Sequence, residues 1–170
     1  MKKLGMLFIG FVLAMVLGAC SGDELDGVED THNAFRDAVG GPEVQEDIEE
    51  VQNLLTEYGM QQISKEEFDE RKEEILVRMG EIQDNLDGID KPKGDKAKEY
   101  YELSYDMTSK SIDGIIDVLD VPEDIEDEDK MLEYQERVEK GQEEEMKAIE
   151  KVEDMREELE EEEGIEFEDE

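Results

Sequence analysis

Apolar residues recur at helical spacing along most of the chain. The clearest run repeats every seven residues, at Phe68, Ile75, Ile82 and Ile89. A repeat of this length keeps one face of a helix apolar and favours near-parallel packing against neighbouring helices. No segment shows the alternation of a half-buried strand over a useful length, and no long internal repeat is present. The pattern therefore predicts an all-α fold, an antiparallel bundle of three to four helices.

Start and stop signals divide this pattern into four long helices, over residues 42–58, 65–86, 95–119 and 130–162. Ser64 and Glu67 have the spacing of a capping box, so Ser64 is expected to cap the second helix. Whether residues 24–39 form a helix is left open, with a short helix over 30–39 as the favoured interpretation. The polar, glycine-containing stretch 141–145 is expected to weaken or bend the last helix.

Each predicted helix carries an apolar face that should turn toward the core. The first two faces consist of Val44, Ile48, Val51, Leu55 and Tyr58, and of Phe68, Ile75, Met79, Ile82 and Leu86. The third consists of Tyr101, Tyr105, Ile112, Ile115, Ile116 and Leu119, interrupted by Thr108. The fourth consists of Met131, Leu132, Gln135, Val138, Ile149, Val152, Met155 and Leu159.

The chain is strongly acidic, with 54 Asp and Glu against 18 Lys and Arg and a formal net charge of −36. Such a charge repels nucleic acid and anionic lipid, and no basic patch exists to contact phosphates, which excludes nucleic-acid binding. Self-repulsion also opposes compaction, so added salt is expected to stabilise the fold by screening it. The single cysteine allows no disulfide framework, so stability must come from packing.

The first 19 residues have the layout of an export signal. Residues 1–3 are Met-Lys-Lys, and residues 4–19 carry no charge and end in small side chains. This apolar run is shorter than the ~20 residues that a comfortable membrane span needs. It leads into Leu17-Gly18-Ala19-Cys20, where Cys20 is the chain's only cysteine.

Residues 17–20 resemble the lipobox of bacterial lipoproteins, Leu-x-small-Cys. The resemblance implies cleavage between Ala19 and Cys20, so that Cys20 becomes the first residue of the mature chain. It also implies a diacylglyceryl group on the Cys20 thiol. Two acyl chains hold a protein stably on a membrane, whereas one binds marginally. The alternatives are an ordinary cleaved signal with an incidental cysteine, an uncleaved membrane anchor, and a reactive free thiol.

The resulting organisation has four parts. They are a signal peptide at 1–19, a lipidated N-terminus and tether with a short helix at 20–41, an acidic helical bundle at 42–163, and a frayed acidic tail at 164–170. The implied location is the extracytoplasmic face of the cell membrane. Ser21 does not suggest inner-membrane retention, so the outer surface of a Gram-positive cell is the preferred address.

Catalytic patterns are absent from the sequence. His32 is the only histidine and is expected to be solvated. Ser104, Ser109 and Ser111 are expected on helix surfaces without a histidine base, and no glycine-rich phosphate loop or EF-hand loop is present. Nearly all carboxylates are expected to form a solvated face. We therefore expect no catalytic residue, no metal ligand and no cofactor.

The tyrosines Tyr100, Tyr101 and Tyr105 cluster on the third predicted helix. Packing at the edge of the core is the favoured interpretation, and a recognition patch for protein or glycan is the alternative, because aromatic residues anchor interfaces. Gly80 and Gly114 lie inside helices, where a close approach of a neighbouring helix is one reason for a glycine.

A non-enzymatic interaction or wall-associated module is the function that these observations favour. Its expected partners are the membrane, through the lipid on Cys20, and an envelope protein or the cell wall. Extracellular binding of divalent cations by the acidic segments 123–129 and 157–163 is the alternative. The sequence does not decide the oligomeric state.

Overall fold

The computed structural model describes residues 26–40, 42–122 and 127–163. Within these ranges the chain forms five helices and no strand: α1 Asp26–Val39, α2 Pro42–Gly59, α3 Lys65–Asp87, α4 Asp95–Leu119 and α5 Glu128–Glu163. The all-α prediction is confirmed. The four long helices match their predicted ranges within two residues at each end, and α1 begins four residues before the short helix expected over 30–39.

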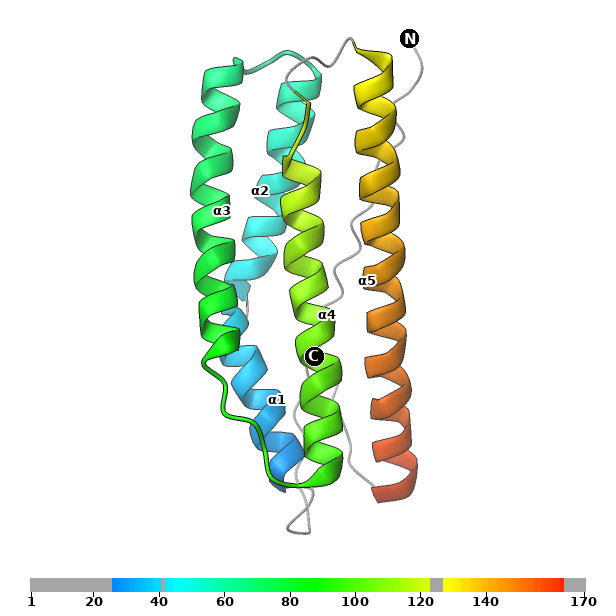
Figure 1. Cartoon of the computed structure of the whole chain (residues 1–170). Coiled ribbons are helices and arrows are strands. Elements are labelled where there is room, and N and C mark those ends of the chain that lie inside the picture. The colour runs from blue at the N-terminus through cyan, green and yellow to red at the C-terminus, as the bar shows by residue number, and fades with distance from the viewer. Residues whose placement is uncertain (1–25, 41, 123–126, 164–170) are drawn as a thin grey trace.

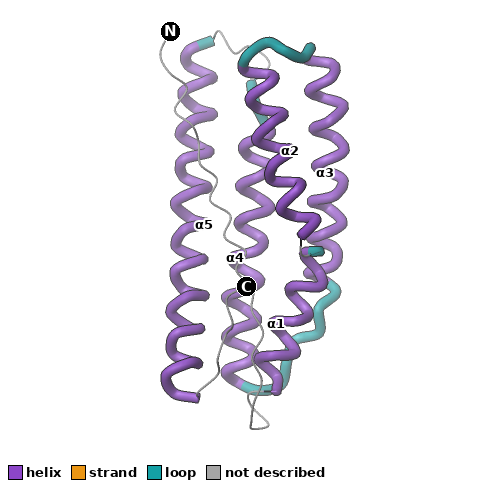
Figure 2. Tube along the Cα trace, turned by 180° about the vertical axis from the view of Figure 1, so that it is seen from behind, coloured by secondary structure: helices purple, strands orange, loops and turns teal. Residues whose placement is uncertain are grey.

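The helices form an antiparallel bundle of four columns (Figure 1). α1 and α2 follow one another along the first column, and α3, α4 and α5 form one column each, so that the chain runs alternately up and down. α4 packs against all the other helices, whereas α5 packs chiefly against α4. Seen from behind, α2 and α3 lie together on the side away from α5 (Figure 2). α1 begins and α5 ends at the same end of the bundle, which we call the α1 end.

Gly40 explains why the first column is made of two helices. Its φ of 85° lies in the left-handed region, which glycine adopts without steric penalty. Its N–H donates to the carbonyl of Arg36 at 3.2 Å, as at many helix C-termini. Pro42 then begins α2, in the first turn, where a missing N–H costs nothing. The range 20–41, assigned to the tether from sequence, thus contains a helix that belongs to the bundle.

The start of α3 follows the predicted capping box. The Ser64 hydroxyl accepts from the backbone N–H of Glu67 at 3.2 Å. The backbone N–H of Ser64 in turn donates to the Glu67 carboxylate at 2.8 Å. Two backbone donors that the helix leaves unpaired are therefore satisfied, and the predicted role of Ser64 is confirmed.

Buried apolar side chains form two clusters. The main core joins all five helices, and the least exposed of its members include Phe35, Leu54, Ile75, Leu86 and Leu119. The second cluster, the α1-end core, joins α1, α4 and α5 through Val28, Ala97, Tyr100, Val152, Met155 and Leu159. α1 lies close to α4 here, because a Cβ at Gly27 would be only 3.1 Å from the Cβ of Ala97. α5 contributes Val138 to the main core and its later turns to the α1-end core.

Several details of the predicted apolar faces are wrong. Ile116 and Leu132, both placed in the core, are 40% and 55% exposed, and Leu54, left out of it, is fully buried. Adjacent positions of a helix differ by about 100° in direction, since a turn takes 3.6 residues. A single position along a stripe therefore decides whether a side chain faces the core. Leu54 is fully buried in the core, whereas Leu55, the residue expected there, is only partly buried.

The expected bend in α5 is absent. α5 is helical throughout Glu128–Glu163, and it runs straight past the stretch 141–145 (Figure 1). Within this stretch Gly141 lies against Asp117 of α4, and Glu145 is buried.

Candidate functional site

Two seven-residue repeats meet where α4 packs against α5, and we call this contact the α4–α5 seam. On α4 the buried positions of the repeat are Ala97, Ser104, Ser111 and Val118, and on α5 they are Val138, Glu145, Val152 and Leu159. Antiparallel packing brings Val118 and Val138 into the main core and Ala97 and Leu159 into the α1-end core. Between these apolar ends the seam is polar, and its centre is a glutamate facing a serine.

Glu145 is the one buried carboxylate among the described residues, with 8% of its surface exposed. The Ser111 hydroxyl donates to its Oε1 at 2.8 Å. Its other oxygen, Oε2, lies over Gly114, 3.7 Å from the place where a Cβ would stand. One turn further along the seam, Gly141 has the same relation to Asp117, with Oδ2 3.6 Å from a Cβ at the glycine. Glycine on each helix thus lies against a carboxylate of the other.

Burial raises the pKa of Glu145, and the hydrogen bond from Ser111 opposes this only in part. Desolvation disfavours the charged form of a carboxyl, whereas a donor to that form favours it. Asp117, a half-buried carboxylate of α4, pairs with Arg137 at 3.4 Å. Glu145 is therefore more easily protonated than an ordinary solvated glutamate.

The serines of α4 do not lie on the surface, so that prediction is wrong for two of three. Ser104 and Ser111 are each 3% exposed, and Ser109 is half-buried. Besides its bond to Glu145, the Ser111 hydroxyl lies 3.2 Å from the carbonyl of Met107. The buried Thr108 hydroxyl donates to the carbonyl of Ser104 at 2.8 Å. Such bonds to the preceding turn satisfy hydroxyl groups inside a helix bundle.

His32 is also buried, with 4% of its surface exposed, so its predicted solvation is wrong. Its Nδ1 lies 2.9 Å from the hydroxyl of Tyr100, which joins α1 to α4. Burial, and then the charges of Arg156 and Arg36, lower the pKa of His32 from 6.5 to about 4. The imidazole is therefore neutral near pH 7 and acts as a buried hydrogen-bonding group.

The tyrosines behave as the favoured interpretation expected. Tyr100 and Tyr101 are buried, and Tyr105 is half-buried against the main core. The Tyr105 hydroxyl donates to the Asp87 carboxylate and so ties α4 to the end of α3. Packing at the edge of the core is confirmed, and the recognition patch is wrong for the two rings that solvent does not reach.

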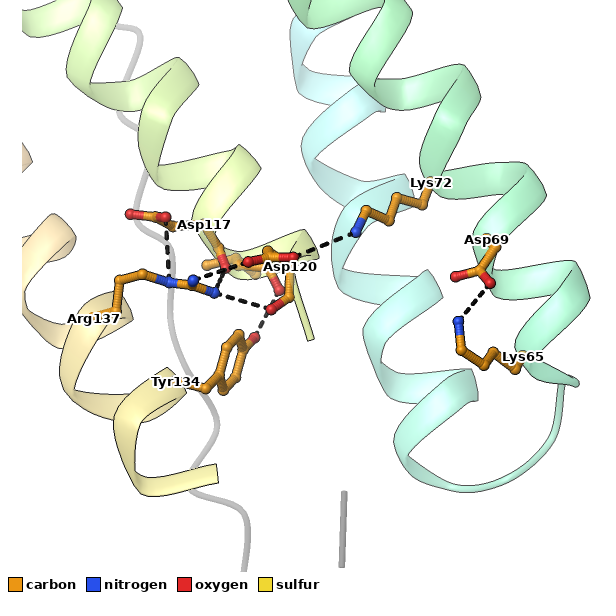
Figure 3. Close-up of polar contacts among 8 residues, drawn as sticks. Lys65, Asp69, Lys72, Asp117, Asp120, Tyr134 and Arg137 are labelled. Atoms are coloured by element: carbon orange, nitrogen blue, oxygen red, sulfur yellow. Dashed lines mark hydrogen bonds and ion pairs between the residues drawn. The ribbon is translucent and has the colours of Figure 1, made fainter. Parts of the chain in front are cut away.

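Arg137 and Tyr134, near the start of α5, bind the end of α4 (Figure 3). The Arg137 guanidinium, on α5, pairs with Asp120 at 2.9 Å and donates to the Asp120 carbonyl at 2.9 Å. Next to it, the Tyr134 hydroxyl donates to the Val118 carbonyl at 2.6 Å. The last carbonyls of a helix have no partner within it, so both side chains of α5 cap the C-terminus of α4. Lys72 of α3 approaches Asp120 at 3.9 Å.

These groups do not form a nucleophile–base pair. Ser111 lies eleven residues along α4 from Tyr100, the partner of His32, which is about 16 Å at the helical rise. In the described part of the chain, no group of three or more His, Cys, Asp or Glu residues could hold a metal ion. The seam is therefore suited to proton binding and helix docking rather than to nucleophilic chemistry.

Some predicted site residues lie outside the described residues. They are Ala19 and Cys20, the cleavage and lipidation positions, residues 123–126 of the first acidic segment, and the tail 164–170. In the other acidic segment, the glutamates among residues 157–161 are exposed, and Leu159 is buried in the α1-end core. Over the described ranges, no helix has the length and apolarity to cross a membrane.

Comparison with known proteins gives no relative. No protein-family model matches the chain, and neither a curated protein nor a solved structure is significantly similar to it.

Sequence reasoning missed Glu145, although a signal for it exists. Glu145 lies seven residues after Val138 and seven before Val152, so it occupies a core position of the repeat. Ser111 occupies the matching place between Ser104 and Val118 on α4. A single polar residue at such a position can set the register between packed helices.

Proposed function

We propose that this chain is a bacterial cell-envelope lipoprotein whose helical body is a non-enzymatic interaction or wall-associated module. The lipid is a diacylglyceryl group on Cys20, and the body faces the outside of the membrane, on a Gram-positive outer surface. The leader and its end at Leu17-Gly18-Ala19-Cys20 support the address. The arrangement of the polar side chains supports the absence of an enzymatic role.

The observation that carries the non-enzymatic proposal is that the candidate chemical groups have structural partners. Ser64 caps α3, and Ser111 bonds Glu145 inside the seam. His32 bonds Tyr100 in a buried contact between α1 and α4. A general base must reach the proton that it abstracts, and a nucleophile must reach its substrate. Ser111 and His32, whose partners lie in the interior of the bundle, meet neither condition, and Ser64 has no base among the described residues beyond its capping partner Glu67.

The charge of the chain narrows the kind of partner. The full chain has a formal net charge of −36, and its leader carries only the two lysines Lys2 and Lys3, so the body is repelled by anionic polymers and anionic lipid headgroups. An envelope partner would therefore offer a neutral or cationic surface, and such an encounter would weaken as salt rises.

Lipidation is tested by replacing Cys20 in the full chain. Wild-type protein is expected in the membrane fraction with the mass of a diacylglyceryl group on its first residue, Cys20, and Cys20→Ser is expected in the medium or unprocessed. Ser21→Ala is the matched control and should behave as wild type. Cys20→Ser protein that has lost its leader and still stays in the membrane fraction, or wild-type protein whose first residue is not Cys20, would end the proposal of a lipid anchor.

The nature of the module is tested by capture from envelope extracts and by calorimetry. Binding to an envelope protein or to purified wall, weakened by salt, supports the interaction module. Saturable binding of Ca²⁺ at micromolar concentration would instead favour the alternative, an extracellular cation-binding lipoprotein that uses the acidic segments. Turnover of a substrate would contradict both.

A further inference from the structure

The centre of the α4–α5 seam combines burial with a charge that has no cation beside it. Burial and the Ser111 hydrogen bond are the influences that move the pKa of Glu145, and no cationic side chain contributes to it. Among the half-buried charged groups of α4, Asp117 pairs with Arg137, and Lys110 pairs with Asp106 at 2.7 Å.

The charged neighbours on α5 itself turn outward into their own ion pairs. Lys140 pairs with Glu144 at 3.6 Å and Lys147 with Glu143 at 3.6 Å, all with exposed side chains. On α1, the titratable His32 bonds Tyr100, about three helical turns from Ser111. An ionised Glu145 therefore has a hydroxyl as its partner where a stable buried charge needs a cation or several donors.

We propose that Glu145 is a proton-controlled latch: its neutral form stays buried against Ser111 with the middle of α5 docked on α4, and its ionisation favours an opened contact in which the carboxylate reaches water. The latch acts on α5 because small and polar residues surround it in the seam. On α4, Ser111 and Gly114 lie against Glu145, and on α5 the residues one turn away are Gly141 and Ala148. Apolar contacts on either side, at Val138 and in the α1-end core, keep the two ends of α5 attached.

The direction of the pH effect follows from the raised pKa of Glu145. Folding then favours the protonated carboxyl, so its contribution is fully present below the pKa of an unfolded glutamate, about 4.5. The contribution is lost as pH rises through the pKa of Glu145 in the folded chain. Docking of α5 should accordingly be tighter at pH 5 than at pH 8.

The test compares Glu145→Gln with Glu150→Gln in the full chain. Both variants remove one negative charge from α5, but residue 150 is exposed and residue 145 is buried in the seam. Thermal unfolding is followed by circular dichroism from pH 5 to pH 8. Glu145→Gln should raise Tm at pH 8 by at least about 3 °C more than the control does, and the difference should shrink toward pH 5.

Hydrogen exchange at one pH locates the effect. At pH 7.5, Glu145→Gln should slow amide exchange in the middle of α5 at least about fivefold relative to wild type, and leave α3 unchanged, because opening of α5 precedes global unfolding. Glu150→Gln should leave both helices close to wild type.

Three results would overturn the proposal. The first is a Glu145→Gln variant that is less stable than wild type or indistinguishable from Glu150→Gln. The second is slower exchange spread evenly over all helices, which would mean that α5 does not open separately. The third concerns Ser111→Ala, which removes the donor to the ionised form and should lower Tm more at pH 8 than at pH 5. An equal loss at both values would show that Glu145 does not change its charge in the seam between pH 5 and pH 8, so that no latch operates there.

Discussion

His32 shows how a single polar residue can be kept neutral inside a strongly acidic protein. Its neighbours Arg156 and Arg36 disfavour the protonated imidazole, and burial disfavours it more. Each pKa unit corresponds to about 1.4 kcal/mol, so the difference between 6.5 and about 4 corresponds to roughly 3 kcal/mol. That energy is the cost of protonating the imidazole where it is buried beside Tyr100, between α1 and α4.

Titration of His32 is directly measurable, because the chain has one histidine and thus one imidazole to follow by NMR. In the folded chain the midpoint should lie near 4, and in denaturant near 6.5. The lowered pKa means that the stabilising contribution is fully present above pH 6.5 and is lost as pH falls toward 4. A folded-state midpoint at 6 or above would contradict the buried, neutral assignment.

His32 and Glu145 consequently respond to acid in opposite ways. Protonation of His32 destabilises the contact between α1 and α4, and protonation of Glu145 stabilises the seam between α4 and α5. Burial produces both shifts, since it disfavours the charged form of either group.

Among the elements, the column made of α1 and α2 depends on Gly40. A side chain at its φ of 85° is strained, so Gly40→Ala should lower the free energy of unfolding by about 1 kcal/mol. Gly80 is the matched control, because it lies in mid-helix in α3 with nothing within 4 Å of a Cβ. Gly80→Ala should raise stability by up to ~1 kcal/mol. Urea unfolding curves measure both, and equal signs would refute the account of the break.

The cap that α5 places on α4 is tested at Arg137. Arg137→Gln removes the donor to the Asp120 carbonyl and leaves Asp117 and Asp120 without their shared cation. The side chain is 42% exposed, so solvent screening limits the loss to about 1 kcal/mol, or 2–4 °C in Tm. Lys140→Gln changes the net charge equally at a 77% exposed side chain and should shift Tm by less than about 1 °C. Equal shifts in calorimetry would contradict the capping role.

The positions of the helices could be predicted from the sequence, because apolar periodicity and helix caps depend on residues that are close in the chain. The bounds of α4 were predicted as found, and the Ser64 capping box fixed the start of α3. Which side chains pack between the helices was harder to predict from the sequence. Leu54 and Leu55 are adjacent leucines, and only the tertiary arrangement decides which one is buried.

The polar interior was the least accessible part of the candidate site. Glu145, His32 and Ser111 are residue types that usually face solvent, so composition argues against their burial. Their burial follows from contacts between helices that are distant in sequence, such as Ser111 with Glu145 and His32 with Tyr100. The repeat position of Glu145 was the one local sign of this arrangement.

The whole molecule carries three acids for each base, 54 against 18, and this ratio decides its response to salt. Salt weakens the surface ion pairs, which contribute at most about 1 kcal/mol each, but it also screens a much larger number of repulsions between acids. Tm should therefore rise between 0.01 M and 1 M NaCl, measured by circular dichroism at pH 7. An unchanged or falling Tm would mean that ion pairs outweigh the repulsion.

α1 begins and α5 ends at the same end of the bundle, so a lipid anchor before α1 would fix which end lies nearer the membrane. Cys20 precedes α1 by six residues, a span of at most about 20 Å, so a lipid there would keep this pole beside the bilayer. α5 has 36 residues and is about 54 Å long. The turn after α2, with its exposed Met60, would then stand some 5 nm out, where an approaching macromolecule arrives first.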